Sequence, residues 1–434
     1  METSPIAPET TSITASVWQK SKLLIKGFMI AGLVLLLLIP SYFVQELIKE
    51  REARQKEAFA EVSSKWAGRQ NLTGPVLVVP YTESPNQTGA SKHFAYFLPD
   101  ELTIDARVQP EERHRGIYQV MLYSSSLNLK GKFNPLPLNK LGIDPANVLW
   151  QDAYICLNLA DPKGLKEDIK LKWNDSTVIA SPAALNNGVM REGFSAPVNI
   201  SAGNTFNFST SISFNGSEQL LFTPVGKETS VKLSSTWPDP SFTGGQLPDH
   251  QISDSGFIAA WKNLSHTRSF PQAWKQDAYN LQSASFGADL FIPVNGYQKT
   301  MRSVKYAVLC ILLTFAAFFI IETVNKRSVH PFQYGLIGAA LILFYTLLLS
   351  FSEYTGFNTA YIIASIATVG LIGWFVKGIL QSTKLTSILA VILVLMYSYV
   401  FTILQIQDYS LILGSIGLFL TLAVIMHFSK KIQW

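Results

Sequence analysis

The sequence predicts an α-helical polytopic membrane protein with six transmembrane helices and a large β-rich, sandwich-like domain inserted between helices 1 and 2. Three observations predict this class. The 434 residues are 48% hydrophobic and only 15% charged, whereas ordinary soluble domains carry about 25% charged residues. Six apolar stretches lie near the N-terminus and in the last third of the chain. The middle segment has ordinary polarity and an alternating hydrophobic pattern, which is typical of a half-buried sheet.

The apolar stretches define the expected membrane segments, because a helix needs about 20 apolar residues to cross roughly 30 Å of hydrocarbon. The alternative, buried helices of a soluble protein, is disfavoured by five such runs close together at the C-terminal end. The predicted spans are Gly27–Val44, Lys305–Val324, Phe332–Phe351, Thr359–Leu380, Thr386–Leu404 and Tyr409–Phe428. The predicted division is a cytoplasmic N-terminal tail (1–26), the first span (27–44), a helical stalk (45–67), a periplasmic β-rich domain (68–304), a five-helix membrane bundle (305–428) and a cytoplasmic C-terminal tail (429–434).

The short loops predict the orientation. If the six spans alternate, nine basic residues fall on one side and none in the short loops opposite, and this asymmetry marks the cytoplasmic side. They are Lys20, Lys22, Lys26, Lys326, Arg327, Lys377, Lys384, Lys430 and Lys431. Both termini are then cytoplasmic, and in a bacterium the large domain is periplasmic. A cleaved signal peptide is the alternative for the first stretch, but "QELIKEREARQKEAFAEV" follows it, without a small-residue cleavage site.

The exported segment shows strand periodicity after the polar, helical stalk. In "TFNFSTSISF", Phe206, Phe208, Ile212 and Phe214 share one face, and Asn207, Ser209, Ser211 and Ser213 share the other. Such one-sided alternation is typical of an antiparallel sheet with a wet and a buried face. The segment "FIAAWKNL" is interpreted as a short helical return towards the bilayer.

Polar residues at the ends of the spans have plain structural interpretations. Glu353 and Gly356 suit a tight outward turn, Asn358 and Asp408 suit helix N-caps, and an ion or proton site is the alternative for the two carboxylates. Glu322 is expected to pair with Lys326, four residues later on its helix. Five tyrosines are expected in an outer aromatic belt: Tyr354, Tyr361, Tyr397, Tyr399 and Tyr409.

Motifs for catalysis or metal binding are sparse. The histidines lack metal-ligand spacing, no nucleophile elbow is present, and Cys156 and Cys310 fall in dissimilar segments. The sequence therefore predicts no catalytic, metal-binding or cofactor-binding residue and no cofactor. One acidic loop, "TWPDPSFTGGQLPDH", gathers Trp237, Asp239, Asp249 and His250. It would suit hydrolysis or binding of a glycan, and an ordinary Pro/Gly-rich surface loop is the alternative.

Several stretches resemble one bacterial family, the CreD inner-membrane proteins. The resemblance rests on "HPFQYGLIGAALILFYTLLLSFSEYTGFNTAYIIAS" and "QIQDYSLILGSIGLFLTLAVIM" in the membrane part, and on "RGIYQVMLY", "STWPDPSFTGGQLP" and "SFPQAW" in the exported part. It implies an inner-membrane location, a role in cell-envelope integrity and colicin tolerance, and control of the gene by a two-component system. It implies no catalytic motif.

The expected function is therefore non-enzymatic support of the envelope, through contacts of the β-domain with a lipid, a glycan or another envelope protein. Membrane lipids are expected partners, and the formal charge of +5 gives no indication of nucleic acid binding. The oligomeric state is left open. One rival is a small-molecule or lipid transporter or channel with a polar groove formed by Ser350, Ser352, Ser365 and Gln405. The other is a periplasmic hydrolase that uses Asp239 and Asp249.

Overall fold

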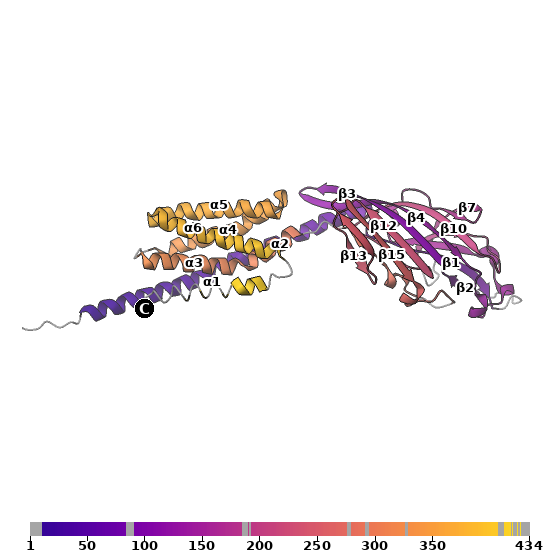
Figure 1. Cartoon of the computed structure of the whole chain (residues 1–434), viewed down its shortest axis with the longest axis horizontal. Helices are drawn as coiled ribbons and strands as arrows, with labels where there is room; N and C mark the ends of the chain where they lie inside the picture. The colour runs from indigo at the N-terminus through magenta and orange to yellow at the C-terminus, as the bar shows by residue number, and fades with distance from the viewer. Residues whose placement is uncertain are drawn as a thin grey trace, which may run out of the picture. The chain divides into compact units, whose positions relative to one another are not determined.

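The computed structural model describes residues 11–83, 91–184, 190, 192–275, 279–290, 295–325, 329–406 and 412–417, together with 419, 423 and 426. The chain forms two compact units (Figure 1), which are described separately. The membrane unit comprises Met1–Lys56 and Val294–Trp434, and the β unit comprises Glu57–Pro293.

Helices make up the described part of the membrane unit. They are α1 (Thr11–Trp66), which continues into the β unit, α2 (Asn295–Lys305), α3 (Ala307–Val324), α4 (Pro331–Thr355), α5 (Phe357–Leu380) and α6 (Thr383–Gln405). Four of them, α1, α4, α5 and α6, are long and apolar enough to cross a membrane. Helices α2 and α3 make a fifth candidate as a pair bent by 44°. Most of the sixth predicted span, including Asp408, lies outside the described residues, although 412–417 are helical.

Two predictions about the membrane unit are wrong. Asn358 is not an N-cap, because α5 begins at Phe357 after Gly356, whose φ of 77° only glycine adopts easily. Tyr361 and Tyr397 are not in an interfacial belt but inside the bundle, where both side chains contact the ring of Phe344. The Tyr361 hydroxyl donates to the Tyr397 carbonyl at 2.9 Å. The prediction used only the position of each tyrosine along its helix. That position does not show whether the side chain faces the lipid or the inside of the bundle. Tyr354, by contrast, is 75% exposed.

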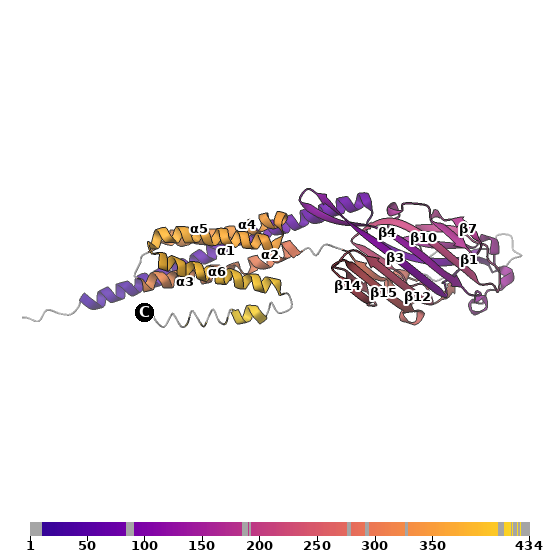
Figure 2. The ribbon, with the colours of Figure 1, turned by 45° about the horizontal axis from the view of Figure 1, so that its top comes forward.

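Two sheets make up the β unit, and Figure 2 looks onto the eight-stranded one. The eight-stranded sheet has the order β14-β15-β12-β3-β4-β10-β6-β7. Its strands are β3 (Glu101–Arg115), β4 (Tyr118–Phe133), β6 (Lys170–Trp173), β7 (Ser176–Ile179), β10 (Phe206–Ser217), β12 (Glu228–Ser235), β14 (Asp249–Ser253) and β15 (Gly256–Leu264). Strands β3 and β12 at its centre are parallel, and the other neighbours are antiparallel.

The nine-stranded sheet has the path β13-β17-β11-β1-β5-β9-β8, with β2 pairing with both β1 and β16. Its strands are β1 (Gln70–Thr82), β2 (Lys92–Phe97), β5 (Tyr154–Leu159), β8 (Ser181–Ala184), β9 (Glu192–Pro197), β11 (Gln219–Phe222), β13 (Ser241–Gly244), β16 (Ala273–Lys275) and β17 (Phe286–Asp289). Six short 3-10 helices connect strands: η1 (Leu138–Leu141), η2 (Pro145–Asn147), η3 (Trp150–Asp152), η4 (Pro162–Gly164), η5 (Ser265–Thr267) and η6 (Leu281–Ala284).

A single hydrophobic core takes side chains from both sheets, which makes the β unit a sandwich. Phe214 from β10 and Phe222 from β11 are both fully buried in it. The predicted faces of "TFNFSTSISF" are confirmed, since Phe206, Phe208, Ile212 and Phe214 are buried and alternate with exposed or half-exposed polar residues.

The expected helix over "FIAAWKNL" is wrong, because the segment forms strand β15. Its burial alternates residue by residue, with Ala259 and Trp261 in the core and Ala260 and Lys262 exposed. This period of two is the strand signal. In the sequence, the two alanines and the Trp–Lys pair suggested a helix, so the alternating strand pattern was not recognised.

Candidate functional site

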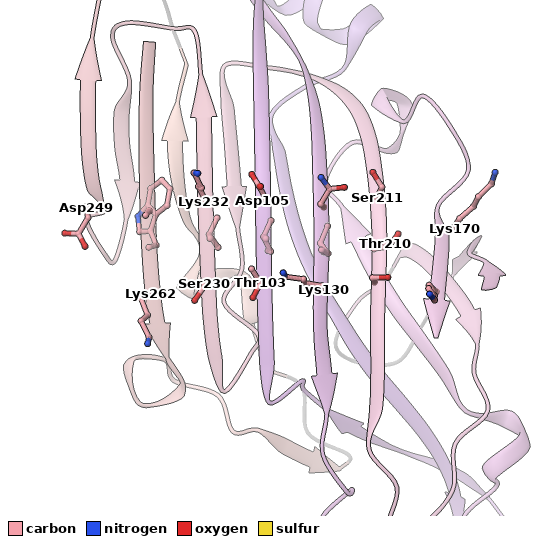
Figure 3. Close-up of a pocket in the computed structure, with 18 of the residues that line it drawn as sticks. Thr103, Asp105, Lys130, Lys170, Thr210, Ser211, Ser230, Lys232, Asp249 and Lys262 are labelled. Carbon is pink, nitrogen blue, oxygen red and sulfur yellow. The ribbon is translucent and has the colours of Figure 1, made fainter. Parts of the chain in front are cut away.

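A hollow of about 830 Å³, lined mostly by residues with polar side chains, lies on the eight-stranded sheet. Figure 3 shows its lining side chains, which come from strands across the full width of the sheet. The outward-facing positions supply Lys, Ser, Thr, Asn and Asp, while the alternate positions of the same strands fill the core. We call this surface the polar face. Five lysines and two aspartates line it, a formal net charge of +3: Lys130, Lys170, Lys172, Lys232, Lys262, Asp105 and Asp249.

Strand register arranges the polar face into two rows that run across the strands. Directly paired residues in neighbouring strands lie side by side on the same face, so a row can be followed through successive pairings. The first, which we call the lysine row, has lysines separated only by hydroxyl residues. It runs Lys262, Ser230, Thr103, Lys130, Ser209, Lys172 and Thr177, from β15 to β7.

The second row, which we call the mixed row, contains both signs of charge. It runs Asp249, Ala260, Lys232, Asp105, Asn128, Ser211, Lys170 and Ile179, from β14 to β7. Lys232 stands directly opposite Asp105. The net positive charge of the polar face is therefore concentrated in the lysine row.

Most of these lysines have no ion-pair partner among the described residues. The exception in the lysine row is Lys262, whose ammonium group lies 2.8 Å from Glu228. This hydrogen bond and the charge of Glu228 raise the pKa of Lys262 above its ordinary value. Outside the hollow, Lys132 forms a similar pair with Glu101 at 2.7 Å. Lys130 and Lys172 remain available to an external anion.

The chemistry of the polar face is that of recognition. An ammonium group offers three donors and no acceptor, and a hydroxyl offers both. The described residues contain no group of three or more His, Cys, Asp or Glu side chains placed to hold a metal ion. The arrangement suits an extended ligand that carries anionic groups and hydroxyls.

Sequence reasoning did not identify this surface. Each lysine occupies an outward position in a short alternating segment, such as "LNLKGKF", "KLKW" and "AWKNL". That alternation would have predicted exposure of Lys130, Lys172 and Lys262. It would not have predicted a common row, because these lysines come from strands β4, β6 and β15, which are far apart in sequence.

The residues of the acidic loop predicted as a hydrolase candidate make separate structural contacts. Asp249 lies on the edge strand β14 and contributes to the polar face. His250 packs against the ring of Phe242 at 5.0 Å. The indole of Trp237 donates to the backbone carbonyl of Asp239 at 2.9 Å. No contact joins the Asp239 and Asp249 carboxylates in the described part of the chain.

A buried ionic cluster occupies one end of the membrane unit. The Glu322 carboxylate pairs with Lys26 of α1, accepts from the Tyr334 hydroxyl at 2.8 Å, and accepts from the Val329 backbone N–H at 2.9 Å. Lys26 also donates to the Val329 carbonyl at 2.7 Å. The predicted partner Lys326 lies outside the described residues. The partner that the structure places on Glu322 comes instead from a distant helix. Local spacing gave no signal for it.

Glu353 also has a partner that was not predicted. Its carboxylate accepts a hydrogen bond from the Tyr297 hydroxyl of α2 at 2.9 Å. It therefore ties α2 to the end of α4, in addition to standing at the turn before Gly356. The alternative interpretation of Glu353 as an ion or proton site receives no support, because no second ionisable partner of its carboxylate is found among the described residues.

The four residues of the expected polar groove do not converge in the described structure. Ser352 donates to its own helix at the Leu349 carbonyl, and Ser350 is exposed. The Ser365 hydroxyl is buried without a hydrogen-bond partner among the described residues. Gln405 instead donates to Asn358 and accepts from Lys299.

Solved structures give only weak likenesses. The M1 zinc metallopeptidase of Deinococcus radiodurans matches with a TM-score of 0.22 and 9% identity, over 68% of this chain and 93% of that chain. A mutant of an M1 zinc metallopeptidase from the same organism, bound to a Tyr-Ser-Ala substrate, matches with a TM-score of 0.19 and 8% identity, over 38% of this chain and 39% of that chain. Likenesses this weak carry no argument about function.

Sequence comparisons are far stronger. The Escherichia coli (strain K12) protein described as "Inner membrane protein CreD" is 30% identical over 429 residues, which cover 96% of this chain and 94% of that protein. The family model described as "Inner membrane protein CreD" matches residues 22–434. The resemblance seen in the sequence is thus confirmed over both units, and the chain belongs to the CreD family of inner membrane proteins.

Proposed function

We propose that this protein is a non-enzymatic inner-membrane component that supports the bacterial cell envelope through contacts of its β unit with an envelope partner. The observation that carries the proposal is the polar face, a wide, net positive surface on which Lys130 and Lys172 have no ion-pair partner among the described residues. Membership of an inner-membrane family supports the location.

The proposed topology has six spans, both termini in the cytoplasm and the β unit in the periplasm. The positive-inside asymmetry of the short loops supports it. Reporter fusions test it: a fusion at Ser217 should be active only with an exported reporter, and a fusion at Arg327 only with a cytoplasmic one. The reverse pattern would place the polar face in the cytoplasm and overturn the proposal.

Complementation of a deletion strain tests the function itself. The strain receives the full chain, a chain lacking the β unit, or the full chain with Asp239→Asn and Asp249→Asn. Envelope support requires the β unit and tolerates the paired substitutions. The readout is survival under detergent and colicin challenge, with protein level in the membrane as the control.

The two rivals predict different outcomes. A periplasmic hydrolase would fail on the paired aspartate substitutions while remaining folded. A transporter or channel would retain part of its activity without the β unit. Either result would replace the envelope-support proposal.

A further inference from the structure

We propose that the polar face binds a linear acidic polysaccharide, laid across the strands along the lysine row. This inference rests on the proposed function and deepens it by naming the chemical class of the partner. It is carried by the register that places Lys262, Lys130 and Lys172 on one line.

The spacing of the lysines suits a polymer better than a single small anion. Lys130 and Lys172 are two strands apart, which at the usual strand separation is about 10 Å, and Lys262 and Lys130 are three strands apart, about 14 Å. No single phosphate or carboxylate bridges such distances. An extended chain with repeated anionic groups can meet each lysine in turn.

The residues between the lysines suit a sugar. Ser230, Thr103 and Ser209 separate the lysines, and none makes a side-chain hydrogen bond to another described residue. A hydroxyl donates and accepts at the same time, as a sugar hydroxyl does. The lysine row contains no acidic side chain, so nothing within it repels an anionic chain. Glu228, which pairs with Lys262, lies outside the row.

The two rows of the polar face offer few of the apolar anchors that a protein or a bilayer would require. Protein interfaces centre on buried aromatic or aliphatic anchors, and interfacial membrane binding needs apolar side chains that enter the headgroup region. Apart from Ile179 at the end of the mixed row, both rows present only charged, hydroxyl, amide and alanine side chains to solvent. The surface is also hollowed rather than protruding. These properties favour a thin hydrophilic chain.

Binding to a fluorescent polygalacturonate tests the inference. The full-length protein is held in nanodiscs of zwitterionic phosphatidylcholine, and affinity is read by fluorescence polarisation at several salt concentrations. We expect Lys130→Gln with Lys172→Gln to weaken binding roughly tenfold and to flatten its salt dependence, as the loss of two exposed charge contacts would. Lys170→Gln with Lys232→Gln in the mixed row should weaken it less.

A matched control removes the same charge elsewhere. Lys140 and Lys163 are exposed lysines on η1 and η4 that do not line the hollow, so Lys140→Gln with Lys163→Gln should leave affinity unchanged. An equal loss in the control and the lysine-row variant would reduce the effect to net charge and overturn the inference. Near-ultraviolet circular dichroism verifies that all variants remain folded.

Competitors decide the chemical class. Neutral dextran and monomeric galacturonate should fail to displace the probe, which would support binding of an acidic polymer. Displacement by polyglutamate as effective as by unlabelled polygalacturonate would overturn the assignment to a glycan. Displacement only by phosphatidylglycerol vesicles would assign the surface to lipid instead.

The outcome is separable from that of the proposed function. If the β unit is required for complementation but polygalacturonate does not bind, the polysaccharide inference fails and the envelope-support proposal stands. If polygalacturonate binds along the lysine row but the β unit is dispensable for complementation, the envelope-support proposal fails instead.

Discussion

Lys26 in the membrane unit and Lys130 in the β unit are the same residue type in opposite situations. The side chain of Lys26 is 17% exposed, pairs with Glu322 and donates to a backbone carbonyl. Lys130 is exposed and has no ion-pair partner among the described residues, although it stands between Thr103 and Ser209 in a row of polar side chains.

The two lysines differ in whether their charge needs a partner. A buried ammonium must find a carboxylate, because an unpaired charge out of water costs several kcal/mol. An exposed ammonium needs no partner, since a surface pair contributes about 0–1 kcal/mol. The β unit does pair lysines elsewhere, as in Lys132–Glu101. The lack of such pairing at Lys130 and Lys172 therefore leaves them free for a ligand.

The largest expected effect comes from breaking the buried pair. Lys26→Met leaves the Glu322 carboxylate buried with only Tyr334 and the Val329 N–H as donors. We expect a loss of about 3–5 kcal/mol in the stability of the membrane unit, measured by unfolding in detergent. Lys384→Met, at an exposed site at the start of α6, is the matched control and should have little effect.

A double substitution sharpens this prediction. Lys26→Met with Glu322→Leu removes both charges, so it should destabilise less than the sum of the two single changes. Additive effects would show that the two side chains do not interact, and the cluster would lose its structural role.

The next largest effect is a pH dependence of stability caused by the buried, neutral thiol of Cys156. Burial of Cys156 raises the pKa of its thiol to about 12 from an ordinary value of 9.0. Above pH 9 the unfolded chain gains a thiolate that the folded chain does not, so stability falls as pH rises from about 9 towards 12. At pH 10 the loss should be about 1–2 kcal/mol, measured by urea unfolding of the β unit. Cys156→Ala should lose this component of the pH dependence, and an unchanged profile would contradict the assignment.

A half-buried carboxylate should matter less than the buried pair. Tyr297→Phe removes the hydrogen bond from α2 to Glu353 and should cost about 0.5–1.5 kcal/mol. Tyr354→Phe changes the same group at a 75% exposed site on the same helix end as Glu353 and should be neutral. If Glu353→Gln abolished complementation at normal stability and protein level, a functional site would replace the structural role.

The smallest effect on stability should come from the polar face. Lys130→Gln with Lys172→Gln should change the free energy of unfolding by no more than about 0.5 kcal/mol, because both side chains are exposed and neither has an ion-pair partner among the described residues. Thermal unfolding of the full-length protein measures this. A large destabilisation would place these lysines with Lys26 as structural charges and remove the reason to regard them as a binding surface.

Local sequence patterns predicted the features that depend on neighbouring residues, namely the faces of a strand and the long apolar helices. Alternation in "TFNFSTSISF" placed Phe206 and Phe214 in the core, since a strand turns successive side chains to opposite faces. Apolar length predicted the long helices α4, α5 and α6. The same local reasoning missed β15, where small and mixed residues weakened the period.

Contacts between distant segments were beyond that reasoning. The lysine row depends on pairings such as Thr103 with Lys130 and Ser230 with Lys262, which tertiary register determines. Likewise, local spacing gave no indication of the pairing of Glu322 with Lys26, 296 positions away. A candidate site made of such pairings becomes visible only when the strands are assembled.

The separation of Lys26 and Glu322 also has a consequence for biogenesis. Lys26 emerges from the ribosome 296 residues before its carboxylate partner, an interval of roughly 15–60 seconds at about 5–20 residues per second. During that time the whole β unit is synthesised, and the Lys26 ammonium group is without its partner from α3. The contact of Lys26 in α1 with Glu322 in α3 can therefore form only late in synthesis.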